Sequence, residues 1–299
     1  MIREYDSVWS LYERFLLEGD NLRNYVKEKK PEVKEKLISE LVKLDEETAL
    51  SRLRTANSLL NEILKALNLM RASTLVVDAR ITYRGLFGAS QGLGSSVFEV
   101  GLTWDPVLDL PVIPGSSFKG AVRGFCIECL RREGRGTAEA ENLCSALLGR
   151  AGERGCASLV IFLDALPIST RGSGKFRGII EKDVLNPHYN ALMRNDLRME
   201  LDVTPIPVIH LSVGEGVQFR FIAYIPYRAS SILNSERERE ELKELCSALN
   251  LKVSGNPLTD AMLATAYLVG GALRLGIGAR TLKGYGRFEI VSSEVRIHA

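Results

Sequence analysis

The chain has 299 residues, of which 45% are hydrophobic and 25% are charged, and its formal net charge is +2. A chain of this length and composition can fold around a sizeable core as a globular protein. No stretch approaches the roughly 20 apolar residues of a membrane helix, and the charged N-terminus lacks the apolar segment of a signal peptide. We therefore expect a cytoplasmic protein without membrane contact. The near-neutral charge excludes a protein that coats nucleic acid by overall charge, so any such contact must come from a local basic patch.

The cysteines form an odd set in a chain without a secretory signal, and we therefore expect no disulfide framework. Two of them have the CxxC spacing of zinc and redox sites, but no second CxxC follows and no histidine lies nearby. We interpret this pair as structural thiols and expect no metal and no cofactor. The five cysteines are Cys126 and Cys129, which form the CxxC, and Cys144, Cys156 and Cys246.

Residues 1–72 are predicted to form a helical extension. Apolar residues recur at helical spacing from Val8 to Leu16, the sequence Gly19-Asp20-Asn21 interrupts the pattern, and Pro31 opens a second segment with its own apolar stripe. Because the heptads are irregular, we expect the extension to pack on the main domain and not to form a coiled coil.

Residues 73–299 are predicted to form one α+β domain. Strands and helices interleave without a run of regular βα units, which favours a ferredoxin-like plan over a doubly wound parallel sheet. The expected strands cover residues 74–83, 158–168, 217–225 and 286–297. The expected helices run from Ser116 or Ser117 to Leu130 and over residues 139–148, 236–249 and 259–273.

The segment LPVIPGSSFKGAVRGF, residues 110–125, combines a helix start with two cations. Ser116 or Ser117 can cap the helix, and Lys119 and Arg123 then lie at i and i+4 on one helical face. A helix N-terminus beside cations is a ready site for an anion such as phosphate. The residues fit a capped helix with solvated cations equally well. Since both cations look exposed, their replacement by alanine is expected to weaken binding without unfolding the protein.

The segment LGIGARTLKGYGRFEI, residues 275–290, places four glycines between an apolar helix and a closing strand. Such a loop lets a ligand approach the backbone, and Arg280 and Lys283 supply charge. It is neither a Walker loop nor a dinucleotide fingerprint. KGYGRFEI is similar to the aromatic signature of RNA-recognition motifs, but Arg287 stands where a stacking aromatic belongs. We therefore expect no base stacking by that mechanism.

A third basic segment, STRGSGKFRG at residues 169–178, alternates glycines with Arg171, Lys175 and Arg177. With Phe176 as its one aromatic residue, it suits a contact that follows the backbone of single-stranded nucleic acid. A surface loop without a ligand fits the same composition nearly as well.

Residues suited to catalysis are sparse. The histidines are His188, His210 and His298, and the sequence contains no HExxH or GxSxG pattern. His188 lies in a polar, turn-like stretch where acid–base chemistry on RNA could occur. His210 lies in an apolar stretch and is expected to satisfy a buried hydrogen bond. Asp164 and Asp183 look isolated, and we assign neither a catalytic role.

Several motifs occur in one order along residues 73–291. A PGSS-x-KG-x-x-R element extends from Pro114 to Arg123, and a GxGxxxxxGYGxF loop from Gly276 to Phe288. These motifs resemble the RAMP superfamily of CRISPR-associated proteins. Between them, DVLNPHY and TPIPVIHLSVGEGVQFRF are similar to the sixth-subunit family of the type III-B Cmr complexes, which the helical N-terminal extension also fits.

The resemblance implies a ferredoxin-like (RRM-like) RAMP fold with insertions, in a non-catalytic RNA-binding subunit of a type III-B CRISPR complex for antiviral defence. The subunit would bind the guide RNA near the 3′ end of that RNA, and it would also contact the target RNA. Its partners would be the backbone RAMP subunit, to which target cleavage is assigned, the small helical subunit and the head-end RAMP subunit. The residues expected to contact RNA are Lys119, Arg123, Arg171, Lys175, Arg177, Arg280, Lys283 and Arg287, with Gly278 and Gly284 admitting its backbone.

Two other functions stay open from the sequence. One is a RAMP endoribonuclease that processes CRISPR transcripts with His188 as acid or base, although such enzymes lack the PGSS-x-KG helix and the PHY element in this arrangement. The other is a protein-only scaffold whose cations pair with carboxylates of its partners. The salt dependence of RNA binding separates these functions. Phosphate contacts predict an affinity for single-stranded RNA that falls steeply with salt, whereas a scaffold predicts almost no RNA binding by the isolated chain.

Overall fold

The computed structural model describes residues 7–17, 31–88, 92–98, 100–150, 156–170, 178–185 and 207–298. In these ranges no helix is long and apolar enough to cross a membrane. The helices are α1 (Val8–Leu17), α3 (Pro31–Leu69), α4 (Gly115–Arg132), α5 (Thr137–Leu148), α7 (Glu236–Ala248) and α8 (Pro257–Leu275), with 3-10 turns η2 (Tyr227–Asn234) and η3 (Thr281–Lys283). The strands are β1 (Ser73–Ile81), β2 (Trp104–Asp105), β3 (Leu110–Pro111), β4 (Ile161–Phe162), β5 (Leu166–Ser169), β6 (Ile180–Leu185), β7 (Val208–Val213), β8 (Gln218–Ile225) and β9 (Phe288–Arg296).

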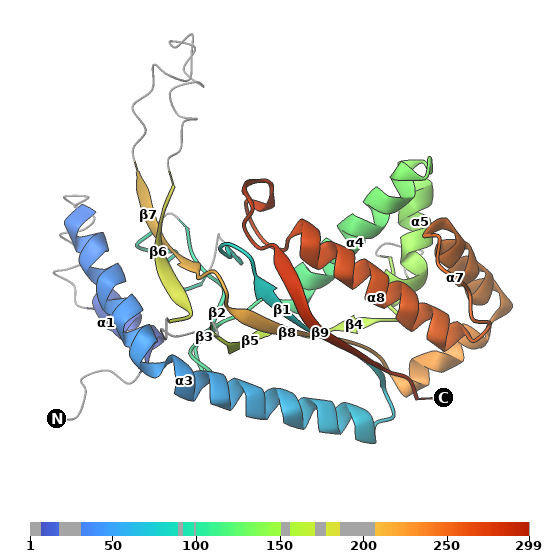
Figure 1. The fold of residues 1–299 in the computed structure, drawn as a ribbon, viewed down its shortest axis with the longest axis horizontal. Coiled ribbons are helices and arrows are strands. Elements are labelled where there is room, and N and C mark those ends of the chain that lie inside the picture. The colour runs from blue at the N-terminus through green and yellow to red at the C-terminus, as the bar shows by residue number, and fades with distance from the viewer. Residues whose placement is uncertain are drawn as a thin grey trace, which may run out of the picture.

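Strands β1 and β8 form the centre of the main sheet, whose order is β4-β8-β1-β9, with β5 also paired to β8. All neighbouring strands in it are antiparallel. Along the chain, β1, α4, β4 with β5, β8, α8 and β9 follow a β-α-β-β-α-β order (Figure 1). The expected α+β class is therefore confirmed.

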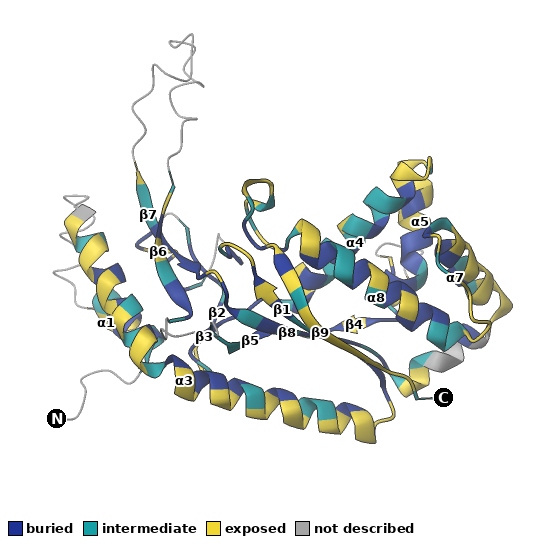
Figure 2. Ribbon diagram, in the orientation of Figure 1, coloured by how far each residue is buried: buried dark blue, intermediate teal, exposed yellow. Residues whose placement is uncertain are grey.

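One face of this sheet carries an apolar core under helices α4 and α8 (Figure 2). Every second residue of β1 from Leu75 to Ile81 is buried there, because side chains alternate along a strand. Phe118 of α4, Phe221 of β8 and Phe288 of β9 are nearly inaccessible to solvent. The ring centroid of Phe221 lies 5.1 Å from each of the other two, in edge-to-face geometry. These rings join the helix layer to the sheet.

Helix α3 runs along the other side of the sheet, where it contacts β1, β5, β6 and β7 (Figure 1). Leu41, Leu53 and Leu60 of its apolar stripe are buried. The Asn57 Nδ2 donates a hydrogen bond to the carbonyl of Ile168 at 2.8 Å. Helix α3 thus packs on the strands of both sheets and does not stand apart from them.

A buried ion pair fixes α3 to the segments around it. Asp45 pairs with Arg52 and accepts the N–H of Ile180 at 2.9 Å. Arg52 also donates to the carbonyl of Asp109, whose carboxylate accepts the N–H of Val8 at 2.8 Å. Loss of these contacts would leave buried charges without partners, which is strongly destabilising. The network therefore holds together α1, α3, the β2–β3 pair and β6.

Strands β6 and β7 form a separate antiparallel sheet, from the pair Ile180↔Val213 to the pair Leu185↔Val208. Val213 also forms a bridge to Gly85, just after β1. The residue pattern of β6 does not predict this hairpin, because three consecutive charged residues hide the alternation of a half-buried strand.

The strand expected over residues 158–168 is instead two short strands, β4 and β5, with Asp164 between them. The carboxylate of Asp164 accepts the N–H of Gly115 at 2.7 Å. It therefore caps α4 from a distant segment, and the expectation that Ser116 or Ser117 caps this helix is wrong. A carboxylate is favourable there because it faces the positive end of the helix dipole.

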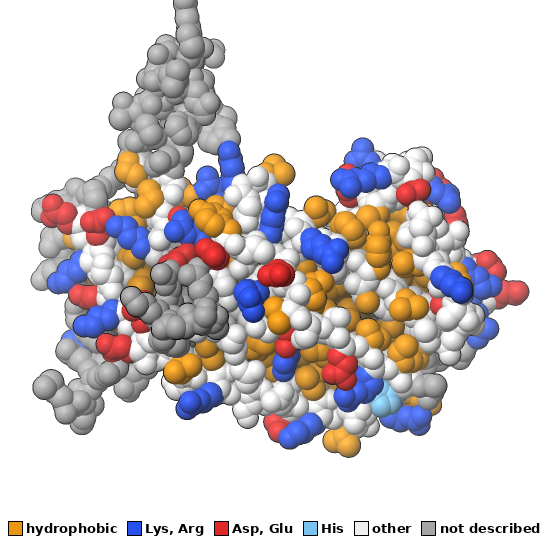
Figure 3. Space-filling view, viewed as in Figure 1, with side chains coloured by type: hydrophobic (Ala, Val, Ile, Leu, Met, Phe, Trp, Pro, Cys, Tyr) orange, Lys and Arg blue, Asp and Glu red, His pale blue; other side chains and the backbone are white. Residues whose placement is uncertain are grey.

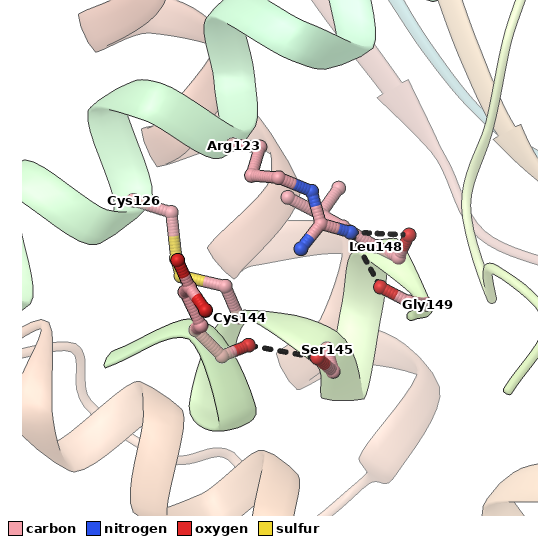
Figure 4. The surroundings of a disulfide bond; sticks show 7 residues. Arg123, Cys126, Cys144, Ser145, Leu148 and Gly149 are labelled. Carbon is pink, nitrogen blue, oxygen red and sulfur yellow. Dashed lines mark hydrogen bonds between the residues drawn. A yellow bond between two sulfur atoms is a disulfide. The ribbon is translucent and has the colours of Figure 1, made fainter. Parts of the chain in front are cut away.

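A disulfide joins Cys126 of α4 to Cys144 of α5 (Figure 4). The expectation of no disulfide is therefore wrong for this pair, because the packing of α4 against α5 brings together two residues 18 positions apart. Cys129, Cys156 and Cys246 are free thiols. The CxxC pair is thus divided between a disulfide and a free thiol.

Titration of the unreduced protein in denaturant is expected to find three reactive thiols among its five cysteines. Reduction is expected to lower the free energy of unfolding by about 3 kcal/mol, because it releases a loop of this length in the unfolded chain. Urea unfolding with and without reductant measures this difference. Five reactive thiols before reduction would contradict the assignment.

Candidate nucleic-acid interface

The glycine-rich loop between α8 and β9 requires glycine at two positions. The φ angles of Gly278 and Gly286 are 96° and 62°, in the left-handed region. A Cβ on Gly286 would lie 1.9 Å from the carbonyl oxygen of Ile277, and one on Gly278 would lie 2.3 Å from that of Leu86. These two glycines are therefore needed for the packing of the loop itself. Gly284, with a φ of 90°, has open space beside it.

The loop is hydrogen-bonded to the segment that follows β1. The N–H of Gly286 donates to the carbonyl of Arg84 at 2.6 Å, and the N–H of Thr82 donates to the carbonyl of Arg287 at 3.0 Å. The hydroxyl of Thr82 donates to the same carbonyl at 3.2 Å. The end of the loop is thus fixed to the end of β1.

Asp183 of β6, which looks isolated in the sequence, anchors the loop from the hairpin. This side chain is almost fully buried, and its carboxylate accepts the hydroxyl of Tyr285 at 2.6 Å and Nη1 of Arg84 at 2.6 Å. Arg84 Nε also donates to Glu181 at 2.9 Å. Burial and the hydrogen bond to Asp183 raise the pKa of Tyr285 to about 12, so its hydroxyl stays protonated as a donor.

His210 of β7 lies next to this carboxylate, with Nε2 3.9 Å from Asp183 Oδ2 and with its side chain fully buried. In the part of the chain that the structure describes, neither ring nitrogen has a hydrogen-bond partner. His210 is thus buried as expected, but the described residues do not show the expected hydrogen bond of its ring. Burial lowers the pKa of His210, although the charge of Asp183 opposes the shift. The imidazole is therefore neutral at pH 7.

Three cations project from the loop around this anchor. Arg280, Lys283 and Arg287 are all exposed. Arg280 has a left-handed φ of 60°, and its guanidinium carbon lies 5.7 Å from the ring centre of Tyr285. Figure 3 shows Lys and Arg side chains gathered around this loop, between the hairpin and α8. The arrangement presents a local positive surface on a chain that is nearly neutral overall.

Lys119 lies toward the same end of the domain as the loop, because α4 and α8 pack antiparallel. Phe125 lies against Gly271, and one turn further along α4 the side chain of Cys129 lies beside that of Tyr267. The start of α4 therefore lies beside the end of α8, where the loop begins.

Arg123 is half-buried and stabilises the C-terminus of α5. Its Nη2 donates to the carbonyl of Leu148 at 2.9 Å and to the carbonyl of Gly149 (Figure 4). A cation is favourable at this helix end. The expectation that Lys119 and Arg123 are both exposed is wrong, since Lys119 is also half-buried. Burial, followed by the charge of Arg123, lowers the pKa of Lys119.

Five other residues singled out in the sequence lie outside the described residues: Arg171, Lys175, Phe176, Arg177 and His188. In the described ranges no group of three or more His, Cys, Asp or Glu side chains could hold a metal ion. The described part of the site therefore offers exposed cations on a braced loop, which is an arrangement for binding a polyanion.

Sequence patterns do not reveal the residues that brace the loop, namely Arg84, Asp183 and Tyr285. Their signal is weak, because each stands in a different segment and only the fold brings them together.

The chain is similar to known proteins in both sequence and fold. The RAMP superfamily model matches residues 46–289. The chain is 30% identical over 286 residues to the CRISPR system CMR subunit Cmr6 of Saccharolobus solfataricus, covering 95% of this chain and 80% of that protein. A chain in the cryo-EM structure of the type III-B Cmr-beta bound to cognate target RNA matches with a TM-score of 0.61 and 23% identity, over 97% of this chain and 93% of that chain. The latter shows a shared fold.

The chain therefore belongs to the RAMP superfamily, as its loop and its PGSS-x-KG element predict. The match of the superfamily model covers the main sheet up to the start of β9, together with the helices between its strands. Within the superfamily, identity over almost the whole chain assigns it to the Cmr6 family.

Replacement of Arg123 by alanine is expected to lower the free energy of unfolding by about 1.5–3 kcal/mol, because it removes charge-assisted hydrogen bonds to the end of α5. Replacement of Lys119, which has no hydrogen bond or ion pair in the described part of the chain, is expected to change it by less than about 1 kcal/mol. Urea unfolding of the two variants measures the difference. A loss below about 1 kcal/mol for Arg123→Ala, as small as that expected for Lys119→Ala, would show that Arg123 is not a structural residue.

The free energy of unfolding is expected to fall as the pH decreases below about 6.5, before the carboxylates titrate. The pKa of His210 is lowered in the folded state, so the unfolded chain takes up a proton that the folded chain excludes, and acid favours unfolding. In a His210→Phe variant this part of the pH dependence is expected to disappear. Thermal unfolding between pH 5 and pH 8 compares the slopes, and identical slopes would exclude His210 as the cause.

Proposed function

We propose that this chain is an RNA-binding subunit of a type III-B CRISPR complex and that it holds the guide RNA, toward its 3′ end, along the loop between α8 and β9. The observation that carries the proposal is the set of exposed cations Arg280, Lys283 and Arg287 on a braced loop. The relative from Saccharolobus solfataricus is a CMR subunit, and the Cmr-beta complex binds target RNA, which supports the same assembly for this chain.

The braced loop suits phosphate binding because its cations need little reorganisation. The hydrogen bonds of Gly286 and Tyr285 hold the loop before any ligand arrives, so less conformational freedom is lost on binding. Guanidinium groups pair with phosphate through parallel hydrogen bonds. Lys119 extends the positive surface toward the start of α4, and the open space beside Gly284 lets a sugar–phosphate chain approach.

The proposal assigns no catalytic step to this chain. The hydroxyl of Tyr285 is committed to Asp183, and His210 is fully buried, so these groups cannot reach an RNA phosphate. Target cleavage would belong to the backbone RAMP subunit. The chain would dock on that backbone subunit, on the small helical subunit and on the head-end RAMP subunit. It would also contact the target RNA. Arg171, Lys175 and Arg177 would add phosphate contacts from their own segment.

Replacement of Lys283 and Arg287 together by alanine is expected to weaken the binding of single-stranded RNA. Each lost phosphate contact removes about 0.7 from the slope of log affinity against log salt, so the double variant is expected to lose about 1.4. Fluorescence anisotropy with a labelled RNA of 12 uridines, titrated at several salt concentrations, measures both slopes.

The matched control is the double replacement of Arg131 and Lys252, which are exposed and carry the same total charge. Arg131 lies at the far end of α4 from the loop. Equal slopes in the two double variants would show that the loop cations make no specific contact. A wild-type affinity that does not change with salt would favour the protein-only scaffold.

A further inference from the structure

Tyr83, in the segment that follows β1, is an exposed aromatic residue beside the cationic loop. Its exposed fraction is 43%, although Ile81 two positions before it is buried. Its ring centroid lies 5.4 Å from that of Tyr285, with an angle of 80° between the ring planes. Since Arg280 contacts the same Tyr285 ring, Tyr83 and a loop cation share one anchor.

The neighbours of Tyr83 hold its ring in place. The guanidinium carbon of Arg84 lies 5.3 Å from the ring centroid, and Arg84 is itself paired with Glu181 and Asp183. On the other side in sequence, Thr82 is hydrogen-bonded to the carbonyl of Arg287. The exposed ring surface is therefore pre-organised, and little conformational freedom would be lost if a flat ligand covered it.

Tyr285, the aromatic residue within the loop motif, cannot offer such a surface. It is only 6% exposed, and its hydroxyl is held by Asp183. Arg287 stands at the position of the stacking aromatic in the similar RNA-recognition signature. In the described part of the chain, the aromatic side chain exposed beside the loop is thus supplied by Tyr83, from a segment that is distant in the sequence.

We propose that Tyr83 stacks on a base of the single-stranded RNA whose phosphates are held by the loop cations. An aromatic face beside a positive groove is the common means of holding single strands, because every base has a face to stack and every nucleotide has a phosphate. The inference rests on the proposed function and adds a base contact to its phosphate contacts. The contact is insensitive to base identity, as a subunit that accepts any guide sequence requires.

The test compares two probes, a labelled RNA of 12 uridines and a 12-mer of abasic ribose phosphates, on the full chain. Tyr83→Ala is expected to weaken binding of the uridine probe about tenfold and to leave binding of the abasic probe unchanged. Tyr83→Phe keeps the aromatic face and is expected to bind both probes like the wild type. The matched control is Tyr227→Ala, because Tyr227 is 50% exposed with Arg71 5.1 Å from its ring centre. Tyr227 follows the end of β8 that pairs with the start of β1, far from the loop.

The outcomes separate this inference from the proposed function. If Tyr83→Ala weakens both probes equally, or neither, while the Lys283 and Arg287 double variant still weakens RNA binding, base stacking is excluded and the phosphate site stands. If Tyr227→Ala weakens the uridine probe as much as Tyr83→Ala, the effect is not local and the inference fails. If the wild-type chain binds neither probe in a salt-dependent way, both fail.

Discussion

The carboxylate of Asp183 is the group on which the geometry of the candidate interface depends. It accepts hydrogen bonds from Arg84, which follows β1, and from Tyr285, which precedes β9. Removal of the carboxylate would leave a half-buried guanidinium with one partner fewer and would take from the buried hydroxyl of Tyr285 its hydrogen bond to Asp183, and both are unfavourable. The network therefore favours a single position of the loop, and with it a single arrangement of the three exposed cations.

The N-terminal extension takes part in this arrangement through the base of the hairpin. Asp45 of α3 accepts the N–H of Ile180, the first residue of β6, and pairs with Arg52, which lies about two turns further along the same face of α3. Asp183 lies three residues further along the same strand. The buried ion pair of α3 thus fixes the strand that in turn fixes the loop, so the extension supports the site although none of its residues lies on the loop.

Among the described residues, several arginines and the loop cations differ in their surroundings. Arg52, Arg123 and Arg220 are tied to protein oxygens, the last by two hydrogen bonds to Asp78 across the sheet. These residues maintain the fold, and their charges are neutralised or turned inward. The loop cations face solvent instead, which explains how a chain with a net charge of +2 can present a surface for a polyanion.

The sequence alone determined the periodic elements, the order of the family motifs and the exposed cations of the glycine-rich loop, because these depend on local pattern and on residue type. It could not determine that Arg123 caps α5, that Asp164 caps α4, that Cys126 meets Cys144 or that Asp183 holds Tyr285. Each of these pairs joins residues from different elements of the fold. Hydrogen bonds and disulfides form between neighbours in space, and only the packing of helices and strands decides which distant residues become neighbours.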